Sequence, residues 1–235
     1  MGALVCLAGM MCDERLFAPL QGRLPQISQM IIPDLSQHDN WHCLADAVLE
    51  QAPPKFGVLG VSFGAALALE LCARAPERIT QLIFMDGNPN ADTPEKREGR
   101  LALVEFLNQH GLRELMWQKQ FPHYLAQSNT NDAVIELCWQ MAETLGADVF
   151  RTQTAALLSR TSRLAELHAF KAPALMLRGA EDRVCPAAYH TELANALPQA
   201  NYHEIGAAGH LPVLEQPEKT IKEINTWMTQ LANVH

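Results

Sequence analysis

Short apolar runs alternate with amphipathic stretches over the first 87 residues of the chain. The apolar runs have the length of strands and lie at 3–9, 28–35, 55–61 and 79–87. Helical spacing occurs between them, at 16–24, 41–52 and 63–77. Asn40 is a candidate N-cap for the second of these helices. Alternation of this kind predicts parallel strands joined by crossover helices. Because the strands are apolar on both faces, helices should cover both sides of the sheet.

The pattern changes at residue 88 and resumes near residue 167. Between these points no segment has strand character, and helices are predicted at 94–109, 111–120, 131–145 and 147–159, with breaks at Gly111 and Gly146. Further strands are then predicted at 172–179 and 200–206, and further helices at 186–197 and 217–232. We therefore expect an α/β fold of about six parallel strands, whose core is formed by residues 1–87 and 167–235. Residues 88–166 form a helical insertion.

A G-x-S-x-G sequence lies where the third predicted strand meets the next helix, at Gly60-Val61-Ser62-Phe63-Gly64. The pattern alone is weak evidence, since a serine at this point could simply cap the helix. Its strand-turn-helix setting is that of a nucleophile elbow, in which glycines on both sides let strand and helix approach closely. The helix N-terminus would direct backbone N–H groups at the site. Ser62 is therefore the candidate nucleophile.

A serine nucleophile needs a histidine base and an acid to orient it, and the elbow architecture requires the order Ser, acid, His. His210 lies in a Gly-rich turn after the last predicted strand, whereas the other eight histidines fit surface or packing roles. Asp182 follows the preceding strand and should lie at the same edge of the sheet. Two other acids stay open as alternatives, namely Glu181 and Asp86, which ends the fourth strand.

Composition narrows the class of protein. The net charge of −8 disfavours nucleic acid and anionic membrane surfaces as partners. The six cysteines form no C-x-x-C pair and no zinc-ligand spacing with histidine, so we expect reduced thiols in a cytoplasmic protein, with no metal and no cofactor. No apolar run reaches the eighteen residues that a membrane span needs. The apolar start has no Lys or Arg before Arg15, which favours a strand over a secretion signal.

The motifs together resemble those of the α/β-hydrolase superfamily. Beside the G-x-S-x-G sequence, the similar segments are Gly179-x-x-Asp182-x-x-x-Pro186, Gly209-His210 followed by Glu215-x-Pro217-Glu218, and Ala75-Pro76-Glu77-Arg78-Ile79. The resemblance implies a Ser62-Asp182-His210 triad under a helical cap at 88–166. Locally, residues 44–64 resemble the esterases that remove a methyl group from a pimeloyl carrier-protein ester. Cap-bearing enol-lactone and C–C bond hydrolases are similar as well, whereas the families with an aspartate nucleophile are disfavoured by Ser62.

These residues predict hydrolysis of a small carboxylic ester or lactone through an acyl-enzyme on Ser62. The backbone N–H groups of Phe63 and Met10 should form the oxyanion hole, with Met11 as second choice for the latter. C–C bond hydrolysis, perhydrolysis and lyase chemistry stay open, as does a non-enzymatic receptor on the same fold.

The substrate pocket is only partly readable from the sequence. Candidate substrate-binding residues are Met11, Trp117, Tyr124 and Leu211, which favour an apolar acyl or alcohol group. Arginines of the insertion could bind a carboxylate or the acidic surface of a carrier protein, although solvated helix faces are the default; they are Arg97, Arg100, Arg113, Arg151, Arg160 and Arg163.

Overall fold

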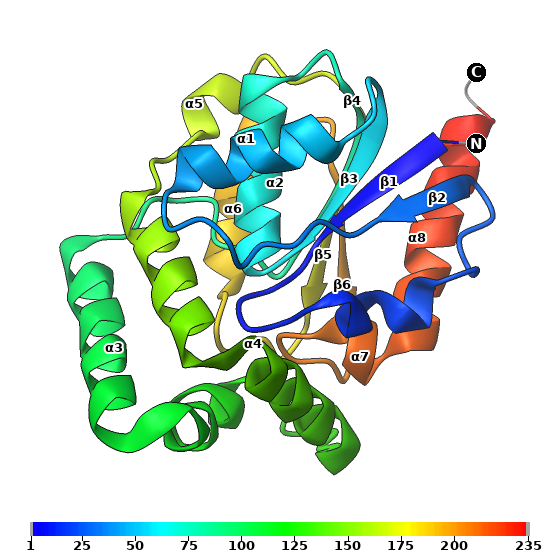
Figure 1. Cartoon of the computed structure of the whole chain (residues 1–235). Coiled ribbons are helices and arrows are strands. Elements are labelled where there is room, and N and C mark those ends of the chain that lie inside the picture. Colours follow the sequence, from blue (N-terminus) through cyan, green and yellow to red (C-terminus); the bar gives the residue numbers. More distant parts are fainter. Residues whose placement is uncertain (1, 234–235) are drawn as a thin grey trace.

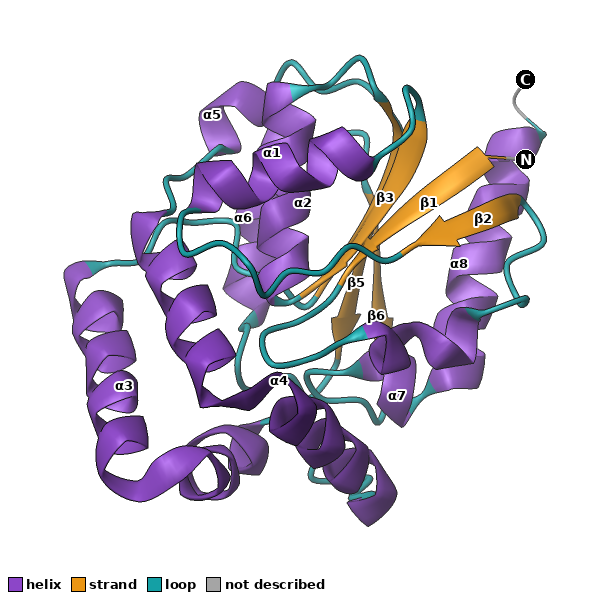
Figure 2. Ribbon diagram, viewed as in Figure 1, coloured by secondary structure: helices purple, strands orange, loops and turns teal. Residues whose placement is uncertain are grey.

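The computed structural model describes residues 2–233 and contains one parallel sheet of six strands (Figures 1 and 2). The strand order is β2-β1-β3-β4-β5-β6. The strands are β1 (Gly2–Leu7), β2 (Ile27–Ile31), β3 (Phe56–Val61), β4 (Ile79–Met85), β5 (Ala174–Gly179) and β6 (Asn201–Ile205). The predicted α/β fold with six parallel strands is confirmed.

Helices cover both faces of the sheet, as the strand pattern predicts (Figure 2). On one face lie α1 (Trp41–Gln51), α2 (Phe63–Arg74) and α6 (Ala187–Ala196); on the other lie the 3-10 helix η1 (Glu14–Leu20), α7 (Pro212–Glu215) and α8 (Pro217–Ala232). Alternate residues of β4 pack on opposite faces of the sheet. Phe84 packs in the cluster with α1, α2 and α6, and Ile83 packs with η1 and α8.

Local signals account for the element boundaries. Asn40 caps α1 as predicted, because its Oδ1 accepts hydrogen bonds from the backbone N–H groups of His42 and Cys43. The helix α2 ends at Arg74, two residues before Pro76 and earlier than the predicted residue 77. The short helices α5 (Leu164–Leu167) and α7 were not predicted, since four residues carry no helical period.

Helices alone fill the chain between β4 and β5, as predicted. They are α3 (Pro94–Leu115), the π-helical turn η2 (Met116–Gln120), the 3-10 turn η3 (Phe121–His123), α4 (Asp132–Ser159) and α5. Gly111 and Gly146 interrupt α3 and α4 with φ of 83° and 82°, so both predicted breaks are confirmed. Neither glycine would meet a neighbour with an added Cβ, so the positive φ alone requires glycine there.

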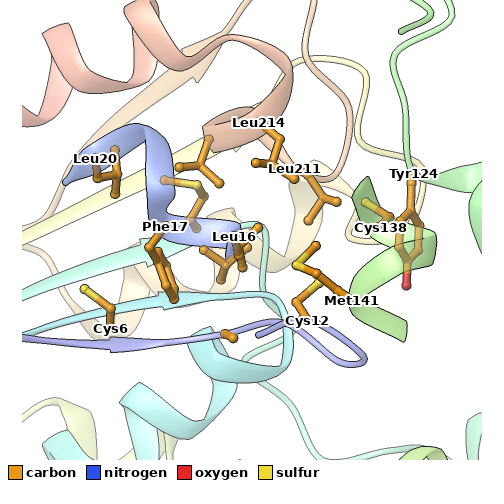
Figure 3. Packing of buried hydrophobic residues seen from close by; sticks show 14 of the residues in the cluster. Cys6, Cys12, Leu16, Phe17, Leu20, Tyr124, Cys138, Met141, Leu211 and Leu214 are labelled. Atoms are coloured by element: carbon orange, nitrogen blue, oxygen red, sulfur yellow. The ribbon is translucent and has the colours of Figure 1, made fainter. Parts of the chain in front are cut away.

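The helical segment packs on the rest of the molecule at several places. Toward the end of α4, Ser159 Oγ accepts a hydrogen bond from Trp41 N–H, at 2.8 Å, and Leu157 joins the core beside α2. Earlier in the segment, Tyr124, Cys138 and Met141 pack against η1, α7 and the loop after β1 (Figure 3). The division of the chain into a core and a cap at 88–166 stays a prediction. Among residues 2–233, no helix combines the length and the apolar character needed to cross a membrane.

Candidate active site

Ser62 lies at the junction of β3 and α2 in a backbone conformation that L-residues rarely adopt. Its φ and ψ are 54° and −109°. The glycines on either side are required by close approach: a Cβ on Gly64 would lie 1.9 Å from Leu7 O, and one on Gly60 would lie 2.3 Å from Gly64 O. The strand and helix can therefore converge at Ser62 only because positions 60 and 64 have no side chain. This is the local structure that the G-x-S-x-G sequence predicts.

His210 connects the serine to an acid across the carboxyl edge of the sheet. Its Nε2 lies 2.8 Å from Ser62 Oγ, and its Nδ1 lies 3.0 Å and 3.1 Å from the two carboxylate oxygens of Asp182. The imidazole is 3% exposed, so water does not compete strongly for these contacts. With Asp182 accepting from Nδ1–H, Nε2 is the nitrogen left to accept the serine proton.

Asp182 is held as a carboxylate. Two backbone N–H groups, those of Val184 and Cys185, donate to its Oδ1 at 2.8 Å and 3.1 Å. Burial alone would raise the pKa of Asp182, but the charge and hydrogen bond of His210, with further hydrogen bonds from Asp86 and Cys185, outweigh it and lower that pKa to about 2. The acid is therefore ionised at neutral pH.

The two alternative acids have other partners. Asp86 is fully buried, has a φ of 48°, and accepts the Gly179 N–H at 2.9 Å through Oδ1. Burial and the neighbouring Asp182 charge raise the pKa of Asp86 well above its usual range, so Asp86 is the protonated member of the pair. Glu181 instead accepts from Ser128 at an exposed position. The structure brings only Asp182 into contact with His210.

Glu215 fixes the loop that carries His210. Its carboxylate is buried and accepts backbone N–H groups from Gly209, Leu211 and Ala126 at 2.8–3.0 Å. The backbone N–H of His210 also donates to Tyr124 O at 2.6 Å. The histidine loop is thus joined to the helical segment through backbone groups. The sequence analysis names Glu215 only as part of a family motif and predicts no role for it. The one feature of the sequence that could have indicated this role is its position five residues after His210.

The loop after β1 passes directly beside the serine. A Cβ on Gly9 would lie 3.6 Å from Ser62 Cβ. Within the described residues, the backbone N–H groups of Met10 and Phe63 have no acceptor among the hydrogen bonds found. Met11 N–H donates to Gln153 Oε1 at 2.9 Å, so the second choice of oxyanion donor is already occupied.

A cavity of about 490 Å³ opens over Ser62 and His210. Met10 and Phe63 border its floor, while Leu103, Gln120 and Tyr124 come from the helical segment. The cavity therefore lies between the carboxyl edge of the sheet and the helices, which is where ligands bind in parallel α/β sheets.

The sequence model of the alpha/beta hydrolase family matches residues 4–223. The chain belongs to this family. It is 26% identical to the pimeloyl-[acyl-carrier protein] methyl ester esterase of Nitrosomonas europaea, over 78% of this chain and 75% of that protein. It is 26% identical to the 2-hydroxymuconate semialdehyde hydrolase of Pseudomonas putida, over 76% of this chain and 64% of that protein.

Other relatives have different lengths and names. The chain is 24% identical to the biotin biosynthesis bifunctional protein BioHC of Cellvibrio japonicus, over 97% of its own residues, and spans only 48% of that protein. Among solved structures, the enol-lactonase from Burkholderia xenovorans LB400 superposes with a TM-score of 0.84 at 19% identity, over 97% of this chain and 91% of that one. A thermophilic esterase from Thermogutta terrifontis gives 0.85 at 22% identity, over 98% and 90%. These superpositions support the fold.

Of the four residues predicted to bind substrate in this α/β hydrolase, one lines the cavity and three do not. Tyr124 lines it, whereas Met11, Trp117 and Leu211 do not. Met11 and Leu211 are 2% and 1% exposed and pack in the core beneath the loops, as Figure 3 shows for Leu211. Trp117 is 40% exposed and packs edge-to-face against Phe121, outside the cavity. An apolar side chain beside a catalytic motif is thus as well explained by core packing as by substrate contact.

Of the six arginines considered as carboxylate ligands, Arg100 and Arg160 line the cavity. The other four have partners elsewhere: Arg97 binds Leu158 O, Arg113 stacks on Trp117 and Trp139, Arg151 binds Asn108 and Asp148, and Arg163 binds Glu70. Lys96 also lines the cavity and was not predicted.

One group of possible metal ligands occurs among the described residues, formed by Asp182, Cys185 and His210, with ligand atoms within 4.8 Å of one another. It overlaps the hydrogen-bonded chain of Ser62. Burial, with the Asp182 charge, raises the pKa of the Cys185 thiol well above its usual value, so this cysteine is a protonated and poor ligand. The arrangement fits proton transfer to and from Ser62 better than it fits coordination of an ion.

Proposed function

We propose that this α/β hydrolase cleaves a small carboxylic ester or lactone through an acyl-enzyme on Ser62. The observation that carries the proposal is the unbroken hydrogen-bonded path from Ser62 Oγ through His210 to Asp182, at 2.8 Å and 3.0 Å, on the floor of a cavity. A serine, a neutral imidazole and a buried carboxylate in this order are the parts of a nucleophilic acyl transfer.

In the proposed first half-reaction, Ser62 Oγ bonds to the carbonyl carbon while its proton passes to His210 Nε2. The tetrahedral intermediate then expels the alcohol oxygen, which takes that proton from Nε2. Asp182, ionised down to about pH 2, stabilises the transient imidazolium. In the second half-reaction water gives a proton to Nε2 and its oxygen to the acyl carbon. The bond between the acyl carbon and Ser62 Oγ then breaks, Oγ takes the proton back from Nε2, and the carboxylic acid is released.

The proposed oxyanion donors are the backbone N–H groups of Phe63 and Met10. Both residues line the cavity beside Ser62, and Phe63 is the first residue of α2, where backbone N–H groups have no partner within the helix. Each such donor is worth about 2.7–4 kcal/mol of transition-state stabilisation in related chemistry.

Ser62→Ala tests this proposal with a panel of short p-nitrophenyl esters. We expect kcat/KM to fall by about 10⁴-fold or more, because no nucleophile remains. Ser28→Ala is the matched control, since Ser28 is exposed on the edge strand β2 and should leave turnover unchanged. Retained turnover in a Ser62→Ala protein that melts like the wild type would contradict the proposal.

The names of two relatives favour a second candidate chemistry at the same serine. One relative is the 2-hydroxymuconate semialdehyde hydrolase. The other is the putative non-heme bromoperoxidase BpoC of Mycobacterium tuberculosis, which is 30% identical over 72% of this chain. Screening β-diketones for C–C cleavage, and peroxide-dependent oxidation, beside the simple esters separates these activities from ester hydrolysis.

A further inference from the structure

On the helical wall of the cavity, positively charged side chains outnumber the carboxylates that pair with them. Lys96, Arg100 and Arg160 all line the cavity that holds Ser62 and His210. In the described part of the chain, the only carboxylate in salt-bridge contact with these three cations is that of Asp92, which is buried between Arg100 and Arg160. The wall therefore carries three cations and one paired carboxylate, which contacts the two arginines and not Lys96.

The three cations differ in how many of their N–H donors already have a partner within the protein. Arg160 is buried, donates to Asn88 O and Asn90 O, and lies over the Trp41 ring. Burial lowers the pKa of Arg160 to about 10, so it stays protonated at neutral pH. Arg100 gives Nε and Nη2 to Asp92. Both arginines are thus fixed in place and contribute mainly their charge.

Lys96 is the cation with unused hydrogen-bond donors. Its Nζ contacts Tyr189 OH and lies 4.4 Å from the centre of the Tyr189 ring, and no salt bridge joins it to a carboxylate among the described residues. A lysine ammonium has three donors, and Tyr189 OH is the one acceptor in contact with it among the described residues, so two donors are left for a ligand in the cavity. Tyr189 also lines the cavity and adds a hydroxyl beside the ammonium.

The spacing of residues along α3 explains why these groups face the same space. Lys96, Gly99, Arg100 and Leu103 line the cavity at positions i, i+3, i+4 and i+7, which form one face of a helix. An added Cβ at Gly99 would meet nothing within 4 Å, so room is left between the two cations. One helix face thus presents two cations, a gap and an apolar residue to the site.

We propose that Lys96, with Tyr189 and Arg100, forms an anion subsite, so that the substrate carries a carboxylate in addition to the scissile ester or lactone. This inference rests on the proposed hydrolysis at Ser62 and specifies its substrate class. A carboxylate would accept hydrogen bonds from the Lys96 ammonium and the Tyr189 hydroxyl and balance the surplus charge of the wall. Apolar residues of the cavity, such as Leu103 and Phe63, would contact the chain between carboxylate and ester.

The test compares substrates of equal size that differ in charge. The probes are monoethyl succinate, glutarate and adipate, each set against its ω-amide, with release of ethanol measured at pH 7.5. We expect kcat/KM for at least one acid to exceed that of its amide by about tenfold or more, mainly through KM, because one charged hydrogen bond contributes that much. Raising the ionic strength should reduce this ratio.

Lys96→Gln should lower the acid-to-amide ratio by about tenfold, whereas Lys119→Gln should leave it unchanged. Lys119 is the matched control because it lies on the same helical segment, is exposed over the Phe106 ring and is outside the cavity. Turnover that depends on Ser62 but shows no preference for the acids would overturn the anion subsite and leave the proposed hydrolysis intact. A preference that survives Lys96→Gln would overturn the role of Lys96. Failure to cleave any ester, acid or amide, would overturn both proposals.

Discussion

The two walls of the cavity are built in different ways. On the sheet side, Ser62 and His210 are placed by backbone groups: glycines that permit close approach, a strained turn, and loop N–H groups bound by Glu215. On the helical side, Lys96 and Arg100 project from one face of α3 and are held by side-chain contacts. The proposed chemistry thus depends on backbone geometry, whereas the proposed anion subsite depends on side chains.

The largest difference between the two sides should appear in the effect of glycine-to-alanine substitutions on folding. Gly64→Ala places a Cβ 1.9 Å from Leu7 O, so we expect little or no soluble folded protein. Gly146→Ala on the helical side meets no neighbour and only strains a backbone at φ 82°, at a cost of about 1–3 kcal/mol. Soluble yield and circular dichroism compare the two variants with the wild type, and urea unfolding gives the stability of any variant that folds. Equal stabilities would contradict the distinction between close approach and conformation.

The next effect separates the two acids that end neighbouring strands. Asp182→Asn should lower kcat by about 10³–10⁴-fold, because His210 loses the carboxylate that orients and stabilises it. Asp86→Asn should change kcat by less than about tenfold, because Asp86 is the protonated neighbour and makes no bond to the imidazole. The measurement is kcat on the best ester at pH 7.5. A larger loss from Asp86→Asn than from Asp182→Asn would reassign the acid.

A smaller effect concerns acid stability on the sheet side. Burial, reinforced by the Arg178 charge, lowers the pKa of His190 to about 4, and its ring packs against Phe84 and Tyr202. Between pH 6.5 and 4 the unfolded chain binds a proton that the folded protein does not. The free energy of unfolding should therefore fall by about 3 kcal/mol as the pH drops through this window.

Urea unfolding at pH 7 and pH 4.5 measures this loss, and His190→Leu provides the comparison. The variant should lose less stability on acidification than the wild type, since it lacks the buried base. An identical loss in both proteins would place the acid sensitivity elsewhere, for example among the exposed groups of the helical side.

The same contrast explains what the sequence could predict. The order of strands and helices, the elbow at Ser62, and the pairing of Asp182 with His210 follow from apolar periodicity and from loops at the ends of parallel strands. The breaks at Gly111 and Gly146 follow from residue type alone. All of these depend on local backbone preferences.

The cavity wall could not be predicted in the same way. Met11 and Leu211 are next to functional positions in sequence yet point into the core, and Lys96 reaches the cavity because of how α3 packs against α4. Sequence spacing shows which residues share the face of a helix, and it does not show what that face is turned toward. Long-range packing decides this, as it does for the binding of Met11 N–H by Gln153 from α4.

Covalent trapping of Ser62 tests most directly whether this serine is the nucleophile. The folded protein is treated with a fluorophosphonate and its intact mass and peptides are measured. We expect a single adduct on Ser62, absent in Ser62→Ala and formed much more slowly in Asp182→Asn, because His210 must activate the hydroxyl. A correctly folded wild-type protein that forms no adduct, or that is modified at another residue, would contradict this role of Ser62.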